Sequence, residues 1–296
     1  MIKFLMAGTA VLGLTALSVQ ADPIVFNYTG SIVDFTVPTT GIYGIDAYGA
    51  QGGSGISPLG QIGIGGAGSE IGGDFALDGG KLLLIAVGGA GTATNATGQG
   101  PGGAGGGGGG GGSFVVASVT TPLVIAGGGG GGGGAVNVNV PGQGGLVGVA
   151  DNSIAGEGGA AGLGPLSGGG GGGFLTAGGS SITLMGGLGG GSFADLTAVG
   201  DGGFGGGGGG AARGGGGGGG DSGGGGGSGD EAGADPGGGG GSFDAGTNQI
   251  LIPDFRVGNG EVVITQIPEP TSLALLGIAL VGMWVVRRRY PSRKEV

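Results

Sequence analysis

The sequence predicts a mainly β protein: an antiparallel β-sandwich with an inserted bundle of extended glycine helices, lying between two targeting segments. Three observations predict it. Glycine supplies 96 of the 296 residues, in unbroken runs of up to eight. Stretches of β-branched and aromatic residues flank the glycine-rich part, and the body shows no apolar repeat with the helical period. Collagen is excluded, because it needs glycine at every third position and abundant proline.

The N-terminus has the parts of a secretory signal peptide. Lys3 precedes an apolar stretch, residues 4–17, and small residues stand near Ala21. We therefore expect residues 1–21 to be a signal peptide that is cleaved after Ala21. An uncleaved anchor helix is the alternative, and both imply export.

Strand-like segments follow in residues 22–126, and one more stands near residue 266. They are rich in β-branched and aromatic residues, and turn residues such as those at 38–41 and 78–80 separate neighbours. Residues 82–87 are continuously apolar, which predicts burial on both faces. The expected strands cover residues 24–28, 31–37, 42–48, 70–77, 81–87, 113–119, 123–126 and 260–266.

Glycine dominates residues 127–249, and short apolar islands interrupt it. A disordered linker is the default for such composition, because ordering glycine costs about 0.5–1 kcal/mol more per residue than ordering alanine. The islands favour a packed alternative, in which extended helices with three residues per turn pair their backbone groups. We expect this bundle mainly in residues 105–112 and 127–249. Runs of five or more glycines lie at 105–112, 127–134, 168–173, 205–210, 214–220, 223–227 and 237–241.

The order of the non-glycine residues in the body is similar to a known module. It resembles the extracellular glycine-rich domain of the anaplastic lymphoma kinase and leukocyte tyrosine kinase receptors over roughly residues 30–266. That resemblance implies a jelly-roll-like sandwich with an inserted bundle of polyproline-II-type helices. It does not imply a receptor function, since there is no kinase domain. The matching segments are 35–53, 73–77, 83–88, 112–115, 122–129, 202–206 and 258–262.

The C-terminus, residues 268–296, has three parts. Pro268, Glu269 and Pro270 come first, an apolar run of 14 residues at 273–286 follows, and Arg287, Arg288 and Arg289 come next. A 14-residue helix is about 21 Å long, against about 30 Å of hydrocarbon, so the run is a marginal membrane span. We expect a membrane helix at about 272–286 and a basic cytoplasmic end at 287–294.

This tail resembles the Pro-Glu-Pro C-terminal (PEP-CTERM) sorting signal of Gram-negative bacteria. The resemblance implies that Pro268, Glu269, Pro270 and the three arginines are recognised by exosortase, a membrane protease that removes the tail. It also implies transient anchoring and an association with bacteria that make exopolysaccharide and biofilm. A plain single-pass anchor is the alternative.

Composition excludes several functions. The chain has no cysteine and no histidine, so thiol nucleophiles, zinc–thiolate sites and imidazole bases are absent. Residues 22–267 carry three cations against 17 carboxylates, a net charge of −14. Such a body repels phosphate backbones, so no nucleic-acid partner is expected. No cofactor is implied.

Because glycine is so abundant, most motif matches in this sequence are expected by chance. Residues 220–224 copy the nucleophile motif of chymotrypsin-like proteases, but a triad needs histidine. Residues 63–68 fit a dinucleotide fingerprint without the required strand and helix. An acidic group suggests weak candidate calcium ligands, and a solvated loop is the favoured interpretation. These candidates are Asp221, Asp230, Glu231 and Asp235.

The sequence therefore indicates an exported, non-enzymatic structural protein of the cell envelope or extracellular matrix. A surface adhesin or carbohydrate-binding module that uses loops at one end of the sandwich is the alternative, with exopolysaccharide as its candidate partner. Tyr43 and Tyr48 are expected to be packing residues rather than a sugar-stacking platform. A hydrolase that uses only carboxylates is a third hypothesis, which needs a pair of them facing a cleft.

Overall fold

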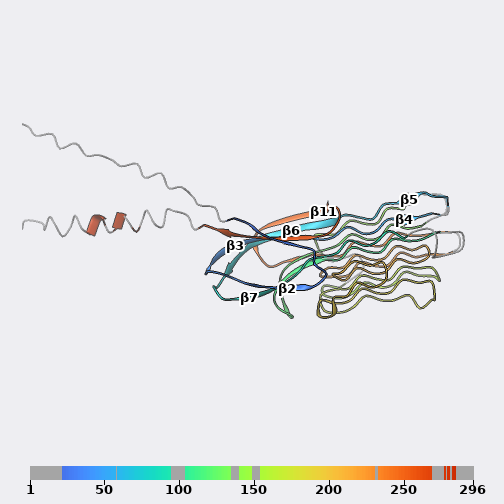
Figure 1. Ribbon diagram of the computed structural model, residues 1–296, viewed down its shortest axis with the longest axis horizontal. Helices are drawn as coiled ribbons and strands as arrows, with labels where there is room; N and C mark the ends of the chain where they lie inside the picture. The colour runs from blue at the N-terminus through green and yellow to red at the C-terminus, as the bar shows by residue number, and fades with distance from the viewer. Residues whose placement is uncertain are drawn as a thin grey trace, which may run out of the picture. The chain divides into compact units, whose positions relative to one another are not determined.

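The computed structural model describes residues 22–57, 59–94, 104–134, 140–148, 154–230 and 233–268, together with 277, 279–280 and 282–284 near the C-terminus. The predicted signal peptide, with its cleavage site at Ala21, lies outside these residues, as does most of the predicted tail. Residues Asp22–Gln266 form one compact unit. Figure 1 shows two sheets on one side of this unit and rows of extended chain on the other.

Strands from both ends of the unit build two five-stranded antiparallel sheets, which confirms the predicted mainly β sandwich. The first sheet has the order β1 (Ile24–Asn27), β12 (Glu261–Ile267), β3 (Gly41–Tyr48), β6 (Gly68–Leu77), β11 (Thr247–Arg256). The second has the order β10 (Phe243–Asp244), β9 (Thr121–Ala126), β8 (Ser113–Ser118), β7 (Leu82–Ala86), β2 (Ile32–Thr36). A short pair, β4 (Gly55–Ile56) and β5 (Ile62–Gly63), stands apart from both.

The two sheets bury their facing side chains against each other. On β3 the residues Tyr43, Ile45 and Ala47 point inward and are buried, because alternate residues of a strand share one face. Leu83 and Val115 of the second sheet belong to the same apolar cluster. This core consists of side chains from two sheets, the usual arrangement in a β-sandwich.

Sequence reasoning missed β10 and β11. Strand β11 is an edge strand whose pairing with β6 has two register shifts, and Asn248 and Asp254 have positive φ. Pro253 stands in its middle. Such irregularity removes the strict alternation that identifies a strand, and it also protects an edge from pairing with other chains. Residues 243–249, which were expected to belong to the bundle, therefore lie largely in the sheets.

The expectation that residues 82–87 are buried on both faces is only partly right. Leu82 is 46% exposed, whereas Ala86 and Val87 are buried. Ala86 belongs to a second apolar cluster, on the outer face of the second sheet. Strand β7 is therefore buried on both faces only near Ala86, where the second cluster covers the outer face of the sheet.

The glycine runs form a packed array of extended segments joined by backbone hydrogen bonds. In the run 105–112, the N–H groups of Gly106, Gly109 and Gly112 donate to one antiparallel neighbour, at Ala211, Gly208 and Gly205. Those of Gly107 and Gly110 donate to a second, and those of Gly108 and Gly111 to a third. A bond to the same neighbour at every third residue matches the three residues per turn of polyproline II.

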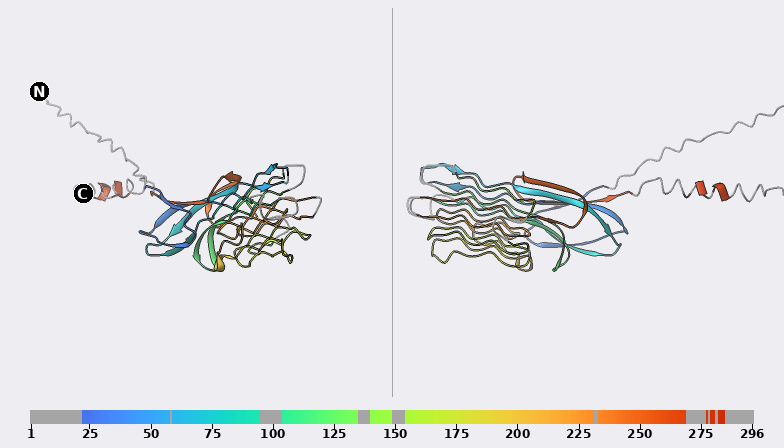
Figure 2. Two further views of the ribbon diagram at one scale, coloured as in Figure 1. Left: turned by 45° about the vertical axis from the view of Figure 1, so that its right-hand side comes forward. Right: turned by 180° about the vertical axis from the view of Figure 1, so that it is seen from behind.

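Side chains are excluded from the interior of this array. A Cβ on Gly107 would lie 2.0 Å from the carbonyl oxygen of Gly53, and one on Gly110 would lie 2.2 Å from that of Ala50. These distances are far inside van der Waals contact, so only glycine allows the backbones to approach this closely. Runs such as 105–112 are therefore interior segments of the array, which we call the glycine bundle (Figure 2).

Segments at the rim of the glycine bundle carry side chains at every third position. Along residues 156–163, Glu157, Ala160 and Leu163 are exposed, while Gly156 and Gly159 are buried. The repeat of three thus places each side chain on the solvent side. In this segment the side chains at every third position therefore lie at the rim, between glycines that face the bundle.

Four phenylalanines join the glycine bundle to the sandwich. Phe114 of β8 points out of the second sheet, and Phe174, Phe193 and Phe204 come from the glycine-rich insertion. The ring centroids of Phe114 and Phe193 are 5.3 Å apart, and those of Phe174 and Phe193 are 5.5 Å apart. Two of the apolar islands in the sequence are therefore anchors. The short 3-10 helix η1 (Phe193–Asp195) supplies one of them.

The described residues of the predicted membrane helix, 277, 279–280 and 282–284, are helical. No helical stretch among the residues that the structure describes is long and apolar enough to cross a bilayer.

Candidate functional site

The glycine bundle ends away from the sheets in a set of turns, which we call the distal end. Strand β4 lies at this end (Figure 1). The N–H of Ile56 in β4 donates to the carbonyl oxygen of Gly105, and the N–H of Gly106 donates to that of Ala211, so residues 105 and 211 lie there too. The turn at 211–214 is hydrogen-bonded to Leu166, and Leu166 to Gly229. The chain reversals at 163–166, 211–214 and 229–234 therefore lie together at one end.

The structure separates the predicted acidic candidates. Asp221 is buried near the sheets, where its N–H donates to the carbonyl oxygen of Gly241. Burial raises the pKa of its carboxyl group above 3.8, and a hydrogen bond from the Gly156 backbone opposes this effect. Asp230 and Asp235 lie instead at the distal end, and Glu231 lies outside the described residues.

Asp230 and Asp235 belong to one tight reversal of the chain. Gly229 and Ala234 form a β-bridge, and the N–H of Asp235 donates to the carbonyl oxygen of Ser228 at 2.8 Å. At the tip, the N–H of Gly233 donates to Oδ1 of Asp230 at 2.6 Å. An aspartate that accepts a hydrogen bond from a following N–H is a common turn-forming device, so the turn accounts for this residue.

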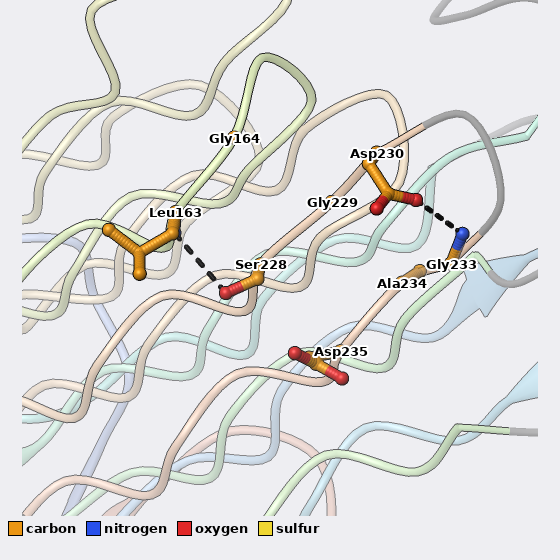
Figure 3. Close-up of a pocket in the computed structure, with 8 residues that line it drawn as sticks. All are labelled: Leu163, Gly164, Ser228, Gly229, Asp230, Gly233, Ala234 and Asp235. Atoms are coloured by element: carbon orange, nitrogen blue, oxygen red, sulfur yellow. Dashed lines mark hydrogen bonds between the residues drawn. The ribbon is translucent and has the colours of Figure 1, made fainter.

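A pocket of about 370 Å³ lies between this acidic turn and Leu163 (Figure 3). The N–H of Leu163 donates to Oγ of Ser228 at 3.2 Å, which joins the two walls. One wall carries the leucine side chain, and the other carries the two carboxylates. The lining residues are Leu163, Gly164, Ser228, Gly229, Asp230, Gly233, Ala234 and Asp235.

A second pocket, of about 340 Å³, shares Leu163 and Gly164 with the first. Its other wall is the turn at 180–183, and the hydroxyl group of Thr183 donates to the carbonyl oxygen of Pro165. Leu163 thus forms a ridge between an acidic pocket and a more apolar one. We call the surface of residues 161–165, 180–184, 228–230 and 233–235 the distal surface.

The apolar side chains of the distal surface face solvent. Leu163 is 82% exposed, Ile182 102% and Leu184 107%. Residues 182–185 are one of the short apolar islands that favoured a packed bundle in the sequence, but the exposure of Ile182 and Leu184 shows that these two side chains contribute nothing to a core. Scattered exposed leucines are ordinary on soluble proteins, but several together beside a pocket indicate an interaction site.

The chemistry of this site is limited. Among the residues that the structure describes, no three acidic side chains come together in a way that could hold a metal ion. Asp230 and Asp235 do share a pocket, as the hydrolase hypothesis requires, but both are exposed.

A second group of polar residues covers the outer face of the first sheet. Burial, and then the charges of Glu70, Asp74 and Asp244, raise the pKa of Asp46 above 3.8. Burial and neighbouring carboxylates, Glu70 first among them, raise the pKa of Tyr48 to about 12.

Tyr43 and Tyr48, which were expected to be packing residues, both pack against other side chains. Tyr43 is buried in the core. The ring of Tyr48 stacks on Phe255 at 6.0 Å between centroids, and the Arg256 guanidinium lies 5.3 Å from its centre. Arg256 is itself held by Glu261 at 3.2 Å. These contacts hold the end of β11 against the sheet.

A comparison with protein families identifies a PEP-CTERM protein-sorting motif over residues 266–289. This confirms the resemblance predicted for the tail, and the matched segment contains Pro268, Glu269, Pro270 and Arg287–Arg289. Their individual roles in recognition stay predictions, and all of them except Pro268 lie outside the described residues. The motif implies that this is an exported, exosortase-processed bacterial protein that is sorted to the cell surface. The matched segment begins within β12.

A search of curated proteins returns no match to the chain. Neither comparison supports the resemblance of the body to the receptor glycine-rich domain, which stays a prediction. The jelly-roll connectivity that this resemblance implied stays a prediction as well.

Proposed function

We propose that the protein is a non-enzymatic structural component of the cell envelope or extracellular matrix, in which the glycine bundle is a rigid spacer. The observation that carries this proposal is the backbone-to-backbone packing of the bundle. Each interior segment is fixed by hydrogen bonds to several neighbours, and its surface is closed to side chains. Such an interior is suited to holding its two ends apart and offers no room for a reaction centre.

The arrangement of the ends supports a spacer. The chain enters and leaves the folded unit through β1 and β12, which pair with each other in the first sheet. The turns of the distal end lie at the opposite side of the bundle. A unit attached through β12 would therefore present its distal surface away from the attachment point.

Rigidity and location can be tested separately. Amide exchange across residues 214–221 should be slowed strongly relative to a free peptide of the same sequence, because each of these N–H groups donates to the backbone of another segment. The mature protein should be recovered from the surface or matrix fraction of the producing bacterium, with a mass that shows the loss of Arg287. Exchange at free-peptide rates would contradict the spacer, and retention of Arg287 would contradict removal of the tail.

A surface adhesin is the second candidate, and the exposed apolar ridge at Leu163 is the observation that favours it. An adhesive site was expected on loops of the sandwich, whereas the pockets beside Leu163 lie on the bundle. Retention of the protein on immobilised exopolysaccharide, with loss of retention in Leu163→Ser, would favour this second function. A spacer without ligand should pass such a column freely.

A further inference from the structure

We propose that Arg213 is the binding site for a single small oxyanion, a sulfate or carboxylate group that is either free in solution or carried by a saccharide. Arg213 stands in the turn at 211–214 of the distal end, and only 5% of the residue is exposed. Its Nε and Nη1 atoms are buried, and neither has a hydrogen-bond partner among the residues that the structure describes. This buried guanidinium with unused donors is the observation that carries the inference.

A buried arginine without acceptors for its donors is energetically costly. Arginine keeps its positive charge at every pH at which proteins fold, and proteins bury such a charge when it is paired or hydrogen-bonded. The other cations of residues 22–267 follow this rule, since Lys81 is exposed and Arg256 pairs with Glu261. Arg213 departs from it, which favours an acceptor from outside the chain.

The turn that carries Arg213 is held by hydrogen bonds to other segments of the bundle. The N–H of Gly214 donates to the carbonyl oxygen of Leu166 at 2.9 Å. The N–H of Gly134 donates to the carbonyl oxygen of Arg213 itself at 2.8 Å. The backbone of Arg213 is thus fixed on both sides, and the side chain extends from a defined point at the distal end.

The acidic turn nearby does not satisfy these donors. It reverses the chain at 229–234 at the same end of the bundle, and it carries Asp230 and Asp235. Asp230 accepts a hydrogen bond from the N–H of Gly233. Whatever else this carboxylate contacts, Nε and Nη1 of Arg213 are left without an acceptor. Asp230 and Asp235 therefore enter the test as competitors for Arg213.

The chemistry of the guanidinium defines the ligand. The group is planar, and its N–H donors match the oxygens of a carboxylate, sulfate or phosphate. An exposure of 5% admits one small group rather than a polymer backbone or a folded surface. Phosphate chains are disfavoured further by the net charge of −14 over residues 22–267. The ligand is therefore a free oxyanion or one charged substituent of a saccharide.

The test uses the full chain in a chloride buffer and measures the binding of radiolabelled sulfate by equilibrium dialysis. We expect one sulfate per chain, displaced by acetate and by trigalacturonate but not by chloride at the same ionic strength. Stronger displacement per carboxylate by trigalacturonate than by acetate would assign the site to a saccharide group. Equal displacement per carboxylate would assign it to free oxyanions.

Arg213→Met locates the site, because methionine keeps a long side chain without the charge. It should weaken sulfate binding about tenfold or more. Without sulfate its thermal midpoint should equal or exceed that of the wild type, since a buried charge has been replaced by an apolar group. Arg256→Met is the matched control, because it removes an equal charge from the sandwich, and it should change sulfate affinity less than twofold.

A second variant covers the case in which Arg213→Met does not fold. Arg213→Lys keeps the charge but loses the planar group with its several donors. It should bind sulfate more weakly than the wild type does. Affinity equal to that of the wild type would contradict recognition by the guanidinium.

Several results would overturn the proposal. One is absent sulfate binding in the wild type, and another is equal sulfate binding in a folded Arg213→Met variant. Binding that appears only in Asp230→Asn with Asp235→Asn would show that the acidic turn pairs with Arg213 in the native protein. A lower thermal midpoint of Arg213→Met, with no response of the wild type to sulfate, would show that Arg213 acts only through packing of its aliphatic stem. None of these outcomes bears on the spacer, which rests on the bundle interior.

Discussion

The sandwich and the glycine bundle bury their interiors in opposite ways. In the sandwich, side chains such as Tyr43 and Leu83 fill the space between two sheets, and the backbone pairs within each sheet. In the bundle, backbone lies against backbone, and each segment pairs with several neighbours in turn. The comparison shows that two chemically different interiors coexist in one unit. The first consists of apolar side chains, and the second consists of glycine backbone without side chains.

This difference changes what each region tolerates. A side-chain core can adjust to a changed residue through rotamers, whereas a backbone lattice has none to rotate. The bundle also loses more conformational entropy on folding, because glycine is the most flexible residue when unfolded. Backbone hydrogen bonds and close dispersion contacts must offset that cost. The four phenylalanines at the junction connect one kind of interior to the other.

The largest expected effect comes from a side chain inside the bundle. In Gly131→Val the new Cβ would lie 1.9 Å from the carbonyl oxygen of Gly107, so the lattice must open. We expect a loss of on the order of 4 kcal/mol or more in the free energy of unfolding, measured by chemical denaturation. Gly148→Ala is the control, since a Cβ there meets no atom within 4 Å. Equal behaviour of the two variants would mean that the runs are not packed.

Loss of a junction ring should have the next largest effect. Phe193 is buried and contacts both Phe114 and Phe174, so Phe193→Ala should cost about 3–5 kcal/mol in the free energy of unfolding. Ile45→Val in the core of the sandwich, at about 0.5–1.5 kcal/mol, provides the comparison. If the junction couples the two interiors, amide exchange should accelerate in both. Acceleration confined to the bundle would show that the sandwich is stable without it.

A smaller effect concerns pH and the sandwich alone. The folded-state pKa of Asp46 is raised, so the folded protein holds this proton more tightly than the unfolded chain. The resulting stabilisation is complete below the unfolded value of about 3.9 and is lost as the pH rises through the higher folded value. Asp46→Asn should therefore show a smaller fall in unfolding free energy between pH 4 and pH 7 than the wild type. An unchanged pH profile in this variant would argue against the role of Asp46.

The smallest effect is expected at the rim of the bundle. Ala160 is exposed, on the solvent side of its three-residue repeat. Ala160→Ser should change the free energy of unfolding by less than about 0.5 kcal/mol, because no packed atom is displaced. A large effect at this position would mean that the rim is covered in the native protein, which would weaken the distinction between rim and interior.

Much of this architecture could be predicted from residue patterns, and the failures have physical causes. Alternation identified β3, and an unbroken apolar run identified β7, because each pattern reports burial directly. Strand β11 was missed because its bulges and Pro253 remove alternation at an edge. The acidic candidates were grouped by their closeness in sequence, but the bundle carries Asp221 to one end and Asp230 to the other. The distal surface was missed because its two walls are about 65 residues apart in the chain.

The sequence by itself determined the sorting tail, the strand-rich ends and the need for backbone contact in the glycine runs. Each of these follows from a local pattern in the sequence. The tail follows from a motif, the strands from alternation of residue types, and the backbone contact from the absence of Cβ atoms. Only the tertiary structure decided which runs are neighbours, which phenylalanines anchor them and where the exposed ridge lies. Glycine runs are alike in sequence, so their order in the bundle cannot be read from them. It is set by hydrogen bonds between segments and by where the anchoring side chains meet the sheets.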